Sequence, residues 1–305
     1  MSTEYIHFTA GQKEAALQTD LVALLQSQGE RLKRSGKEYV WRDGSEKVTV
    51  RGNLWFHQYE RIGGDAVDFV RRFYNMDFPQ AVNFLLGNNG SALPQAEPVK
   101  REPPKPFTLP PRNDNMRRVF AYLLNRRGID RDVLYAFVHK EMIYESADYH
   151  NAVFVGYDEH GIARHAHKRG TGSESTYKGN AESCDPRYSF HWTGTDNTLY
   201  LFEAPIDMLS FISLHKENWR SHSYAAACCV GDQVLFQMLK ANPNIDTVCL
   251  CMDNDTAGQA ANKRISDKLF IQGIKHEILV PEFKDWNEDL LYDEQEETEC
   301  QTLQL

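Results

Sequence analysis

Two acidic residues follow an apolar, β-prone stretch of this 305-residue sequence. The stretch 246–252 is followed by Asp253 and Asp255, which are separated by one residue. Gly258 comes three residues after Asp255. Successive strand residues point to opposite faces of a sheet, so residues two apart are expected to point the same way. Paired carboxylates suit Mg²⁺, a hard cation that binds one or two carboxylates together with substrate phosphates.

More acids follow other β-prone stretches. Glu203 ends the run 199–202, and Asp207 lies four residues later, in the first turn of an expected helix. Asp285 lies in the loop after the last expected strand. Ligands of open α/β sheets gather at the carboxyl ends of the strands, so all five acids are expected at one sheet edge.

Clustered carboxylates repel one another unless cations neutralise them. The sequence therefore predicts a Mg²⁺ site, with Mn²⁺ as a substitute, for phosphoryl or nucleotidyl transfer. The expected metal ligands are Glu203, Asp207, Asp253, Asp255 and Asp285. The competing interpretation of Asp253 and Asp255 taken alone is helix capping or solvated loop positions.

The elements that would position these acids begin at residue 198, where β–α alternation starts. Such alternation implies a mostly parallel sheet flanked by helices. Strands are expected at 198–203, 224–229, 246–252 and 276–280, and helices at 205–216, 231–241 and 257–271.

The front of the chain has a different pattern. Short β-prone stretches with turn signals lie between residues 38 and 59, and a helix is expected after Asp65. Residues 162–191 are basic and polar and are expected to include a mobile loop. We expect an α+β domain at 1–90, a Pro-rich linker at 91–113, an α+β subdomain at 114–195, the parallel-sheet domain at 196–290 and an acidic tail at 291–305.

Composition narrows the function classes. The net charge is −9, but the block 31–72 holds ten Lys and Arg against six acids, so overall acidity does not exclude phosphate contacts. The sequence has no apolar run long enough for a membrane span and no signal-peptide pattern. The six cysteines include no Cys-x-x-Cys pair. A cytoplasmic protein with buried thiols is the interpretation that fits.

The acidic motifs taken in order resemble the Toprim domain, which is shared by bacterial primases, topoisomerases, recombination proteins and some nucleases. The resemblance rests on Glu203-x-x-x-Asp207, then Asp253-x-Asp255-x-x-Gly258, then Lys284-Asp285-Trp286-Asn287, and it covers about 198–290. It implies that Glu203 is the general acid/base and that the four aspartates are metal ligands. Ala204 stands where many members have glycine, which puts the local backbone turn in question.

The front half resembles the primase branch of that family. The segment from Gly63 to Val70 and the following Phe78–Val82 are similar to the end of the primase zinc ribbon. No cysteine occurs before residue 184, and a tetrahedral zinc site needs four N or S ligands. We therefore expect a zinc-free ribbon. Its expected core consists of Trp41, Trp55, Phe56 and Tyr59.

The middle segment resembles the domain of unknown function that precedes Toprim in primase-like proteins of mobile elements. Its basic side chains are expected to bind nucleic acid or nucleotides near the metals, against the alternative of a solvated strand face. The candidates are Arg164, Lys168, Arg169, Lys178 and Arg187.

Three functions follow from the resemblance. The first is a Mg²⁺-dependent, primase-like nucleotidyltransferase that makes primers on single-stranded DNA during replication or transfer of a mobile element such as a plasmid. The second is a non-catalytic Toprim DNA-binding accessory protein. The third is a metal-dependent Toprim nuclease. Replication or conjugation proteins are the expected partners.

Overall fold

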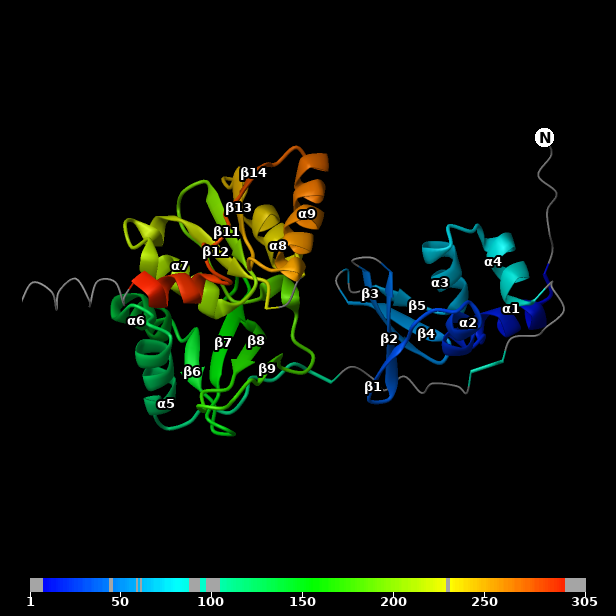
Figure 1. The fold of residues 1–305 in the computed structure, drawn as a ribbon, viewed down its shortest axis with the longest axis horizontal. Coiled ribbons are helices and arrows are strands. Elements are labelled where there is room, and N and C mark those ends of the chain that lie inside the picture. The colour runs from blue at the N-terminus through cyan, green and yellow to red at the C-terminus, as the bar shows by residue number, and fades with distance from the viewer. Residues whose placement is uncertain are drawn as a thin grey trace, which may run out of the picture. The chain divides into compact units, whose positions relative to one another are not determined.

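A computed structural model of the chain divides into two compact units, Met1–Pro103 and Pro104–Leu305 (Figure 1). It describes residues 8–43, 46–58, 60, 62–87, 94–96, 105–228 and 231–293. About half of the expected linker and most of the expected acidic tail lie outside these residues.

The first unit contains a five-stranded antiparallel sheet in the order β1-β2-β3-β4-β5. Its strands are β1 Lys33–Ser35, β2 Glu38–Asp43, β3 Glu46–Arg51, β4 Leu54–His57 and β5 Gly63–Gly64. Its helices are α1 Ala10–Leu17, α2 Leu21–Ser27, α3 Ala66–Phe73 and α4 Phe78–Leu85. Asp65 caps α3 by accepting hydrogen bonds from the Val67 and Asp68 backbone N–H groups, as its sequence position predicts.

Aromatic packing forms the core of this sheet domain. The rings of Trp41 and Trp55 each lie 5.2 Å from the Phe73 ring, and both tryptophans are buried. The expectation for Phe56 was wrong, because it is the outward-facing neighbour of Trp55 on β4 and is 38% exposed. The fourth expected core residue, Tyr59, lies outside the described residues.

The second unit begins with helical segments and an antiparallel sheet in the order β6-β7-β8-β9. Its elements are α5 Arg117–Phe120, the π-helical turn η1 Ala121–Arg126, α6 Arg131–His139, β6 Ile143–Glu145, β7 Ala152–Tyr157, β8 Ala163–Arg169, β9 Lys178–Asn180 and the turn η2 Pro186–Tyr188. The loop expected within 162–191 is restricted to the connection between β8 and β9. Backbone pairing with β7 organises residues 163–169 into β8, and β9 and η2 follow the connection.

A second sheet in this unit has the order β10-β12-β11-β13-β14. Pairing is parallel from β12 through β14, and only β10 runs antiparallel to its neighbour. The elements are β10 His191–Trp192, β11 Thr198–Phe202, α7 Pro205–Leu214, η3 Trp219–Ser221, β12 Ser223–Ala226, α8 Gln233–Ala241, β13 Thr247–Cys251, α9 Thr256–Ile271 and β14 Lys275–Ile278. The expected fold class, a mostly parallel sheet flanked by helices, is confirmed.

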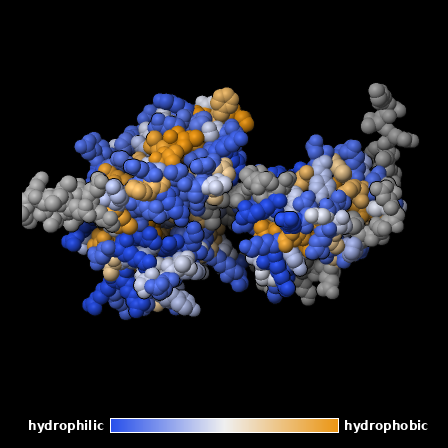
Figure 2. All heavy atoms as spheres, in the orientation of Figure 1, coloured by the Kyte–Doolittle hydropathy of each residue, from blue (hydrophilic) through white to orange (hydrophobic). Residues whose placement is uncertain are grey.

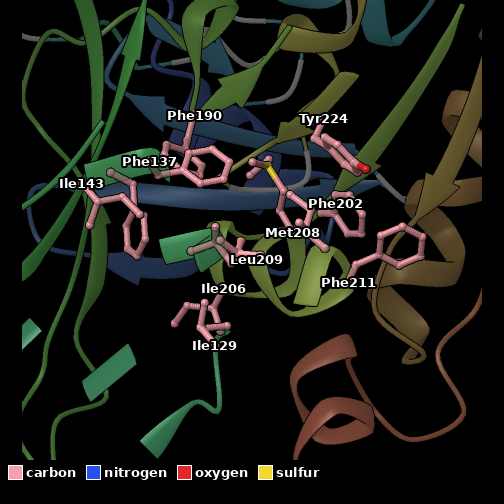
Figure 3. Close-up of a cluster of buried hydrophobic side chains, with 14 of the residues drawn as sticks. Ile129, Phe137, Ile143, Phe190, Phe202, Ile206, Met208, Leu209, Phe211 and Tyr224 are labelled. Atoms are coloured by element: carbon pink, nitrogen blue, oxygen red, sulfur yellow. The ribbon is translucent and has the colours of Figure 1, made fainter. Parts of the chain in front are cut away.

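Helices cover both faces of this parallel sheet (Figure 1). On one face α8 and α9 pack against Leu201, Val248 and Leu250. On the other face α7 packs in a core that extends to α6 and β6, and Phe202 and Met208 belong to one cluster with Phe137 and Ile143 (Figure 3). Because one apolar cluster joins the antiparallel and parallel sheets, these two parts fold as one unit.

The visible surface is mostly hydrophilic (Figure 2). Exposed apolar side chains occur at the end of α9, where Phe270 is 79% and Ile271 is 82% exposed. In the part of the chain that the structure describes, no helix combines the length and the apolar character needed to cross a membrane.

Candidate active site

The first two acids are positioned by the junction between β11 and α7. β11 ends at Phe202, and Glu203 follows it directly. Asp207 lies in the first turn of α7 and is buried, with 6% of its surface exposed. Ala204 has extended backbone angles, φ −134° and ψ 159°, which any residue adopts. The departure from glycine at this position therefore does not disturb the turn.

The second pair of acids lies beyond the end of β13, not within the strand. Asp253 lies two residues after Cys251, the last strand residue, and Asp255 is the N-cap of α9. The Asp255 carboxylate accepts hydrogen bonds from the N–H groups of Ala257 and Gly258, each at 2.9 Å. The strand-alternation argument does not apply to these two residues, because the strand has already ended at Cys251.

Gly258 allows the first turn of α9 to approach Asp253 closely. A Cβ atom at residue 258 would lie 2.0 Å from the Asp253 carbonyl oxygen and 3.0 Å from its nitrogen. No side chain fits in this space, so glycine is required here for a steric reason. The glycine of the motif thus fixes the backbone that presents Asp253.

Asp285 begins a helical segment at residues 286–293. Its carboxylate accepts hydrogen bonds from the N–H groups of Asn287 and Glu288, at 3.1 and 2.9 Å. The Trp286 indole N–H donates to the Cys251 carbonyl at 3.0 Å, and the Asn254 N–H donates to the Lys284 carbonyl at 2.8 Å. These bonds fasten the Asp285 loop to the carboxyl end of β13.

Four of the five predicted acids line one pocket of about 340 Å³, which we call the acidic pocket. They are Glu203, Asp207, Asp253 and Asp285. Asp255 does not line it, but its charge contributes to raising the pKa of Glu203 and Asp253. The carboxyl ends of the parallel strands therefore bring together acids that are more than 80 residues apart in sequence, as Glu203 and Asp285 are.

Burial and mutual repulsion raise the pKa values of these acids. Burial, followed by the charges of Glu203, Asp285 and Asp255, raises the pKa of Asp253 to about 7. Burial is also the main cause that raises the pKa of Asp207 well above its usual value, and Asp253 adds to it. The pKa of Glu203 rises by burial, and Lys178 opposes that rise. Protonation or a bound cation relieves this repulsion.

Cationic side chains from the antiparallel part line the same pocket. Arg169 ends β8, Lys178 begins β9, and the two residues are paired across the sheet. Arg127 and Lys284 also line the pocket. The site therefore places carboxylates opposite guanidinium and ammonium groups, an arrangement suited to a metal–phosphate ligand.

The other three predicted basic residues lie elsewhere. Lys168 lines a separate pocket, because neighbouring residues of β8 point to opposite faces. The Arg164 guanidinium donates to Asp158 at 2.7 Å, and that of Arg187 donates to Asp185 at 2.6 Å. Only Arg169 and Lys178 of the predicted group reach the acidic pocket.

A polar network that includes Arg127 and Asn287 in the wall of this pocket joins the antiparallel and parallel parts, and its members were not predicted as site residues. Arg127 donates to the Asn287 side-chain oxygen at 2.9 Å and to the Tyr122 hydroxyl at 3.0 Å. The Asn287 amide donates to the Arg127 carbonyl at 2.7 Å and to the Ser210 hydroxyl at 3.0 Å. The turn at Gly128, with φ +65°, was the available sequence signal for Arg127.

The donor set fits Mg²⁺ in its chemistry. All the acids supply oxygen, and the Asp253 Oδ1 atom is buried with no hydrogen-bond partner. Across the described residues, no three histidine, cysteine or acidic side chains are gathered closely enough to hold a metal as they stand. Mg²⁺ keeps several waters and takes one or two carboxylates plus phosphates, so a preformed cage of three is not required.

Comparison with known families agrees with the order of the motifs. Residues 200–290 match the family described as Toprim-like, and residues 121–196 match a protein family of unknown function, DUF3991. The resemblance predicted from the acidic motifs and from the segment before them is thereby confirmed.

An uncharacterized protein of Bacillus anthracis, pXO2-78, is 25% identical over 274 residues, covering 85% of this chain and 79% of that protein. The primase fragment of the bacteriophage T7 primase-helicase is 19% identical with a TM-score of 0.46, covering 67% of this chain and 83% of that one. The Aquifex aeolicus primase, with zinc-binding and RNA polymerase domains, is 15% identical with a TM-score of 0.40, covering 96% and 85%. Both structures are partial likenesses of fold.

Proposed function

We propose that this chain, whose residues 200–290 form a Toprim-like domain, is a primase-like nucleotidyltransferase acting on single-stranded DNA. The observation that carries the proposal is the acidic pocket. It sets Glu203, Asp207, Asp253 and Asp285 against Arg127, Arg169 and Lys178. A nucleoside triphosphate with its metal ions has the matching charge pattern.

Each side of the pocket has its own part in the reaction. Arg127, Arg169 and Lys178 bind and orient the triphosphate, since guanidinium groups match phosphate geometry. The 3′-hydroxyl of one nucleotide attacks the α-phosphate of the next; a phosphodiester bond forms, the α–β bond breaks and pyrophosphate leaves. Glu203, whose pKa is raised mainly by burial, accepts the hydroxyl proton.

Mg²⁺ is the metal that the resemblance implies, and Asp207, Asp253 and Asp285 would hold it, with Asp255 close by. When bound, it would neutralise the phosphates and lower the pKa of the attacking hydroxyl. The carboxylates themselves gain from this binding, because a cation removes the repulsion that raises the pKa values of Asp207 and Asp253.

The setting we propose is a mobile element. The plasmid designation pXO2 in the name of the Bacillus anthracis relative supports it. A primase of this kind starts complementary-strand synthesis after single-stranded transfer or during replication.

The test incubates the full chain with single-stranded DNA, labelled ribonucleotides and Mg²⁺ or Mn²⁺. We expect short labelled products from the unmodified protein and a loss of about 100-fold or more in Glu203→Ala and Asp253→Asn. Asp267→Asn, at an exposed aspartate of α9, is the matched control and should retain activity.

Two outcomes would contradict the proposal. DNA binding without synthesis in the unmodified protein would indicate a non-catalytic accessory protein. Metal-dependent nicking of supercoiled plasmid without synthesis would indicate a nuclease.

A further inference from the structure

The face of the β6–β9 sheet opposite the acidic pocket has a larger pocket of about 800 Å³. We call it the tyrosine pocket. The residues that define it are Tyr149, Tyr177, Lys168, Arg118, Thr108 and Pro110. Lys168 and Arg169 are neighbours on β8, so this one strand supplies a cation to each pocket.

Tyr149 is the most exposed large aromatic residue described, with 88% of its surface accessible. Its backbone nevertheless belongs to a turn that hydrogen bonds hold in place. The His150 ring nitrogen Nδ1 lies 2.7 Å from the buried Glu145 carboxylate, and the Thr171 hydroxyl donates to the His150 carbonyl at 2.8 Å. Because the backbone beneath the uncovered Tyr149 ring is held in place, little backbone entropy is lost when a ligand stacks on the ring.

The backbone of this turn is strained as well. Tyr149 and His150 both have positive φ angles, +60° and +51°, in the region that glycine normally occupies. Two successive left-handed residues that are not glycine persist only where surrounding contacts impose them, and such strain concentrates at ligand-binding sites.

Tyr177 supplies a second ring, which is 46% exposed. The Lys168 ammonium lies 5.8 Å from the centre of that ring. The Tyr177 carbonyl accepts a hydrogen bond from the Gly170 N–H at 2.9 Å, which closes the loop between β8 and β9. A cation beside a stacking ring matches a base attached to its phosphate.

The charge of the pocket is close to balanced. Lys105 pairs with Glu182 at 3.1 Å, and the remaining charged side chains are Lys168, Arg118 and Asp148. A polyanion would therefore gain little from electrostatics alone. Rings, hydroxyl groups and two cations instead favour a ligand with a flat aromatic group and a single phosphate.

We propose that the tyrosine pocket binds nucleotide units by stacking bases on Tyr149 and Tyr177, at a site separate from the acidic pocket. Either a single-stranded DNA or a free mononucleotide carries this chemistry. The assignment to a DNA template rests on the proposed function, whereas the binding itself does not.

Contacts within the described residues connect this site to the acidic pocket. The Arg126 guanidinium donates to the Gly172 carbonyl of the β8–β9 loop at 2.9 Å. The next residue, Arg127, lines the acidic pocket. A strand bound on the tyrosines would therefore hold the loop that leads into Lys178.

The test measures binding of a fluorescent oligothymidylate about eight nucleotides long to the full chain, by anisotropy in a metal chelator. We expect Tyr149→Ala to weaken binding about tenfold and Tyr149→Phe to leave it near the unmodified value, because stacking needs only the ring. Phe270→Ala, at an equally uncovered aromatic residue on α9, is the matched control and should have no effect.

A second measurement does not depend on substitutions. Crosslinking with an oligonucleotide that contains 5-bromouracil should attach it to peptides carrying Tyr149 or Tyr177. Competition by thymidine monophosphate identifies the source: displacement at similar concentrations indicates a free nucleotide as the ligand, whereas resistance indicates a strand.

The proposal is overturned if Tyr149→Ala and Tyr177→Ala bind as tightly as the unmodified chain, or if crosslinks fall only elsewhere. Asp253→Asn separates this result from the proposed function. It should lose synthesis while retaining oligonucleotide binding in the chelator.

Discussion

The acidic pocket and the tyrosine pocket lie on opposite faces of one antiparallel sheet. They differ in how much the empty pocket destabilises the folded chain. In the acidic pocket, burial and mutual repulsion raise the pKa values of Glu203, Asp207 and Asp253. In the tyrosine pocket, the principal groups are uncovered rings and a nearly balanced set of charges. The first pocket therefore opposes folding until a cation or proton arrives, whereas the second does not.

Ligand affinity at the two sites is therefore expected to depend on different variables. Affinity in the acidic pocket depends on pH and on divalent cations, because its side chains titrate and repel. Affinity in the tyrosine pocket depends on ring area, because stacking is insensitive to proton concentration. A DNA strand that passes from one pocket to the other would be bound by stacking on the tyrosines and would react among the charged side chains of the acidic pocket.

The largest expected effect is a difference in primer synthesis between variants of Arg169 and Lys168, which are neighbours on β8. Arg169→Gln should lower kcat/KM for ribonucleotides by about 100-fold, because a cation is lost beside the reacting phosphates. Lys168→Gln should lower it less than about tenfold and should mainly weaken oligonucleotide binding. The measurement is steady-state primer synthesis together with anisotropy for both variants. Equal losses in synthesis would mean that the two faces are not functionally distinct.

The parallel sheet and its acids followed directly from the sequence. The strands β11 and β13 are short apolar runs, each followed by a helix. Glu203 comes directly after β11, and Asp253 comes two residues after β13. Because the carboxyl ends of parallel strands lie at one edge of a sheet, Glu203, Asp207, Asp253 and Asp285 are expected together without knowledge of side-chain packing. The error at Asp255 arose because the last strand residue is Cys251, and sequence reasoning fixes strand ends poorly.

The rest of the site was harder to predict for a physical reason. Arg127 and Asn287 meet through bonds across 160 residues, and nothing local in either segment signals that pairing. Tyr149 lies in a left-handed turn that favours glycine or asparagine, so the sequence gives no reason to expect an exposed tyrosine on a hydrogen-bonded turn there. Pairing of β8 with β7 also depends on register, which an irregular basic sequence does not reveal.

The next prediction concerns the hydrogen-bond network of Asn287 and Arg127 at the acidic pocket. Asn287→Ala removes three buried hydrogen bonds, including one from the Arg127 guanidinium, and leaves their partners unsatisfied. We expect the free energy of unfolding to fall by about 2–3 kcal/mol. Denaturant titration measures it.

Asn254→Ala is the control for that loss. Asn254 is exposed, and its side chain donates to the Pro281 carbonyl at 3.2 Å. Its replacement should cost less than about 1 kcal/mol. If the two variants were equally stable, the network would not be what holds the two sheets together.

The smallest effect concerns pH, and its sign distinguishes the pockets. Burial, with help from Glu203, raises the native pKa of Asp253 to about 7, above the value of about 4 expected for an unfolded aspartate. Between these values the native state binds more protons than the unfolded state. The free energy of unfolding contributed by Asp253 therefore falls as pH rises through this window and stays low above it.

Asp253→Asn should reduce the pH slope and, in a chelator at pH 8, stabilise the chain by about 1 kcal/mol, which is less than the full shift because the carboxyl is partly solvated. Millimolar Mg²⁺ should reverse the order, because only the unmodified carboxylate gains from a cation. Tyr149→Ala should change stability by less than about 0.5 kcal/mol at either pH. Thermal unfolding at pH 5 and pH 8 measures all three proteins. A pH slope that is undiminished in Asp253→Asn would mean that Asp253 does not bind the extra proton of the native state, and the contrast between the two faces would lose its physical basis.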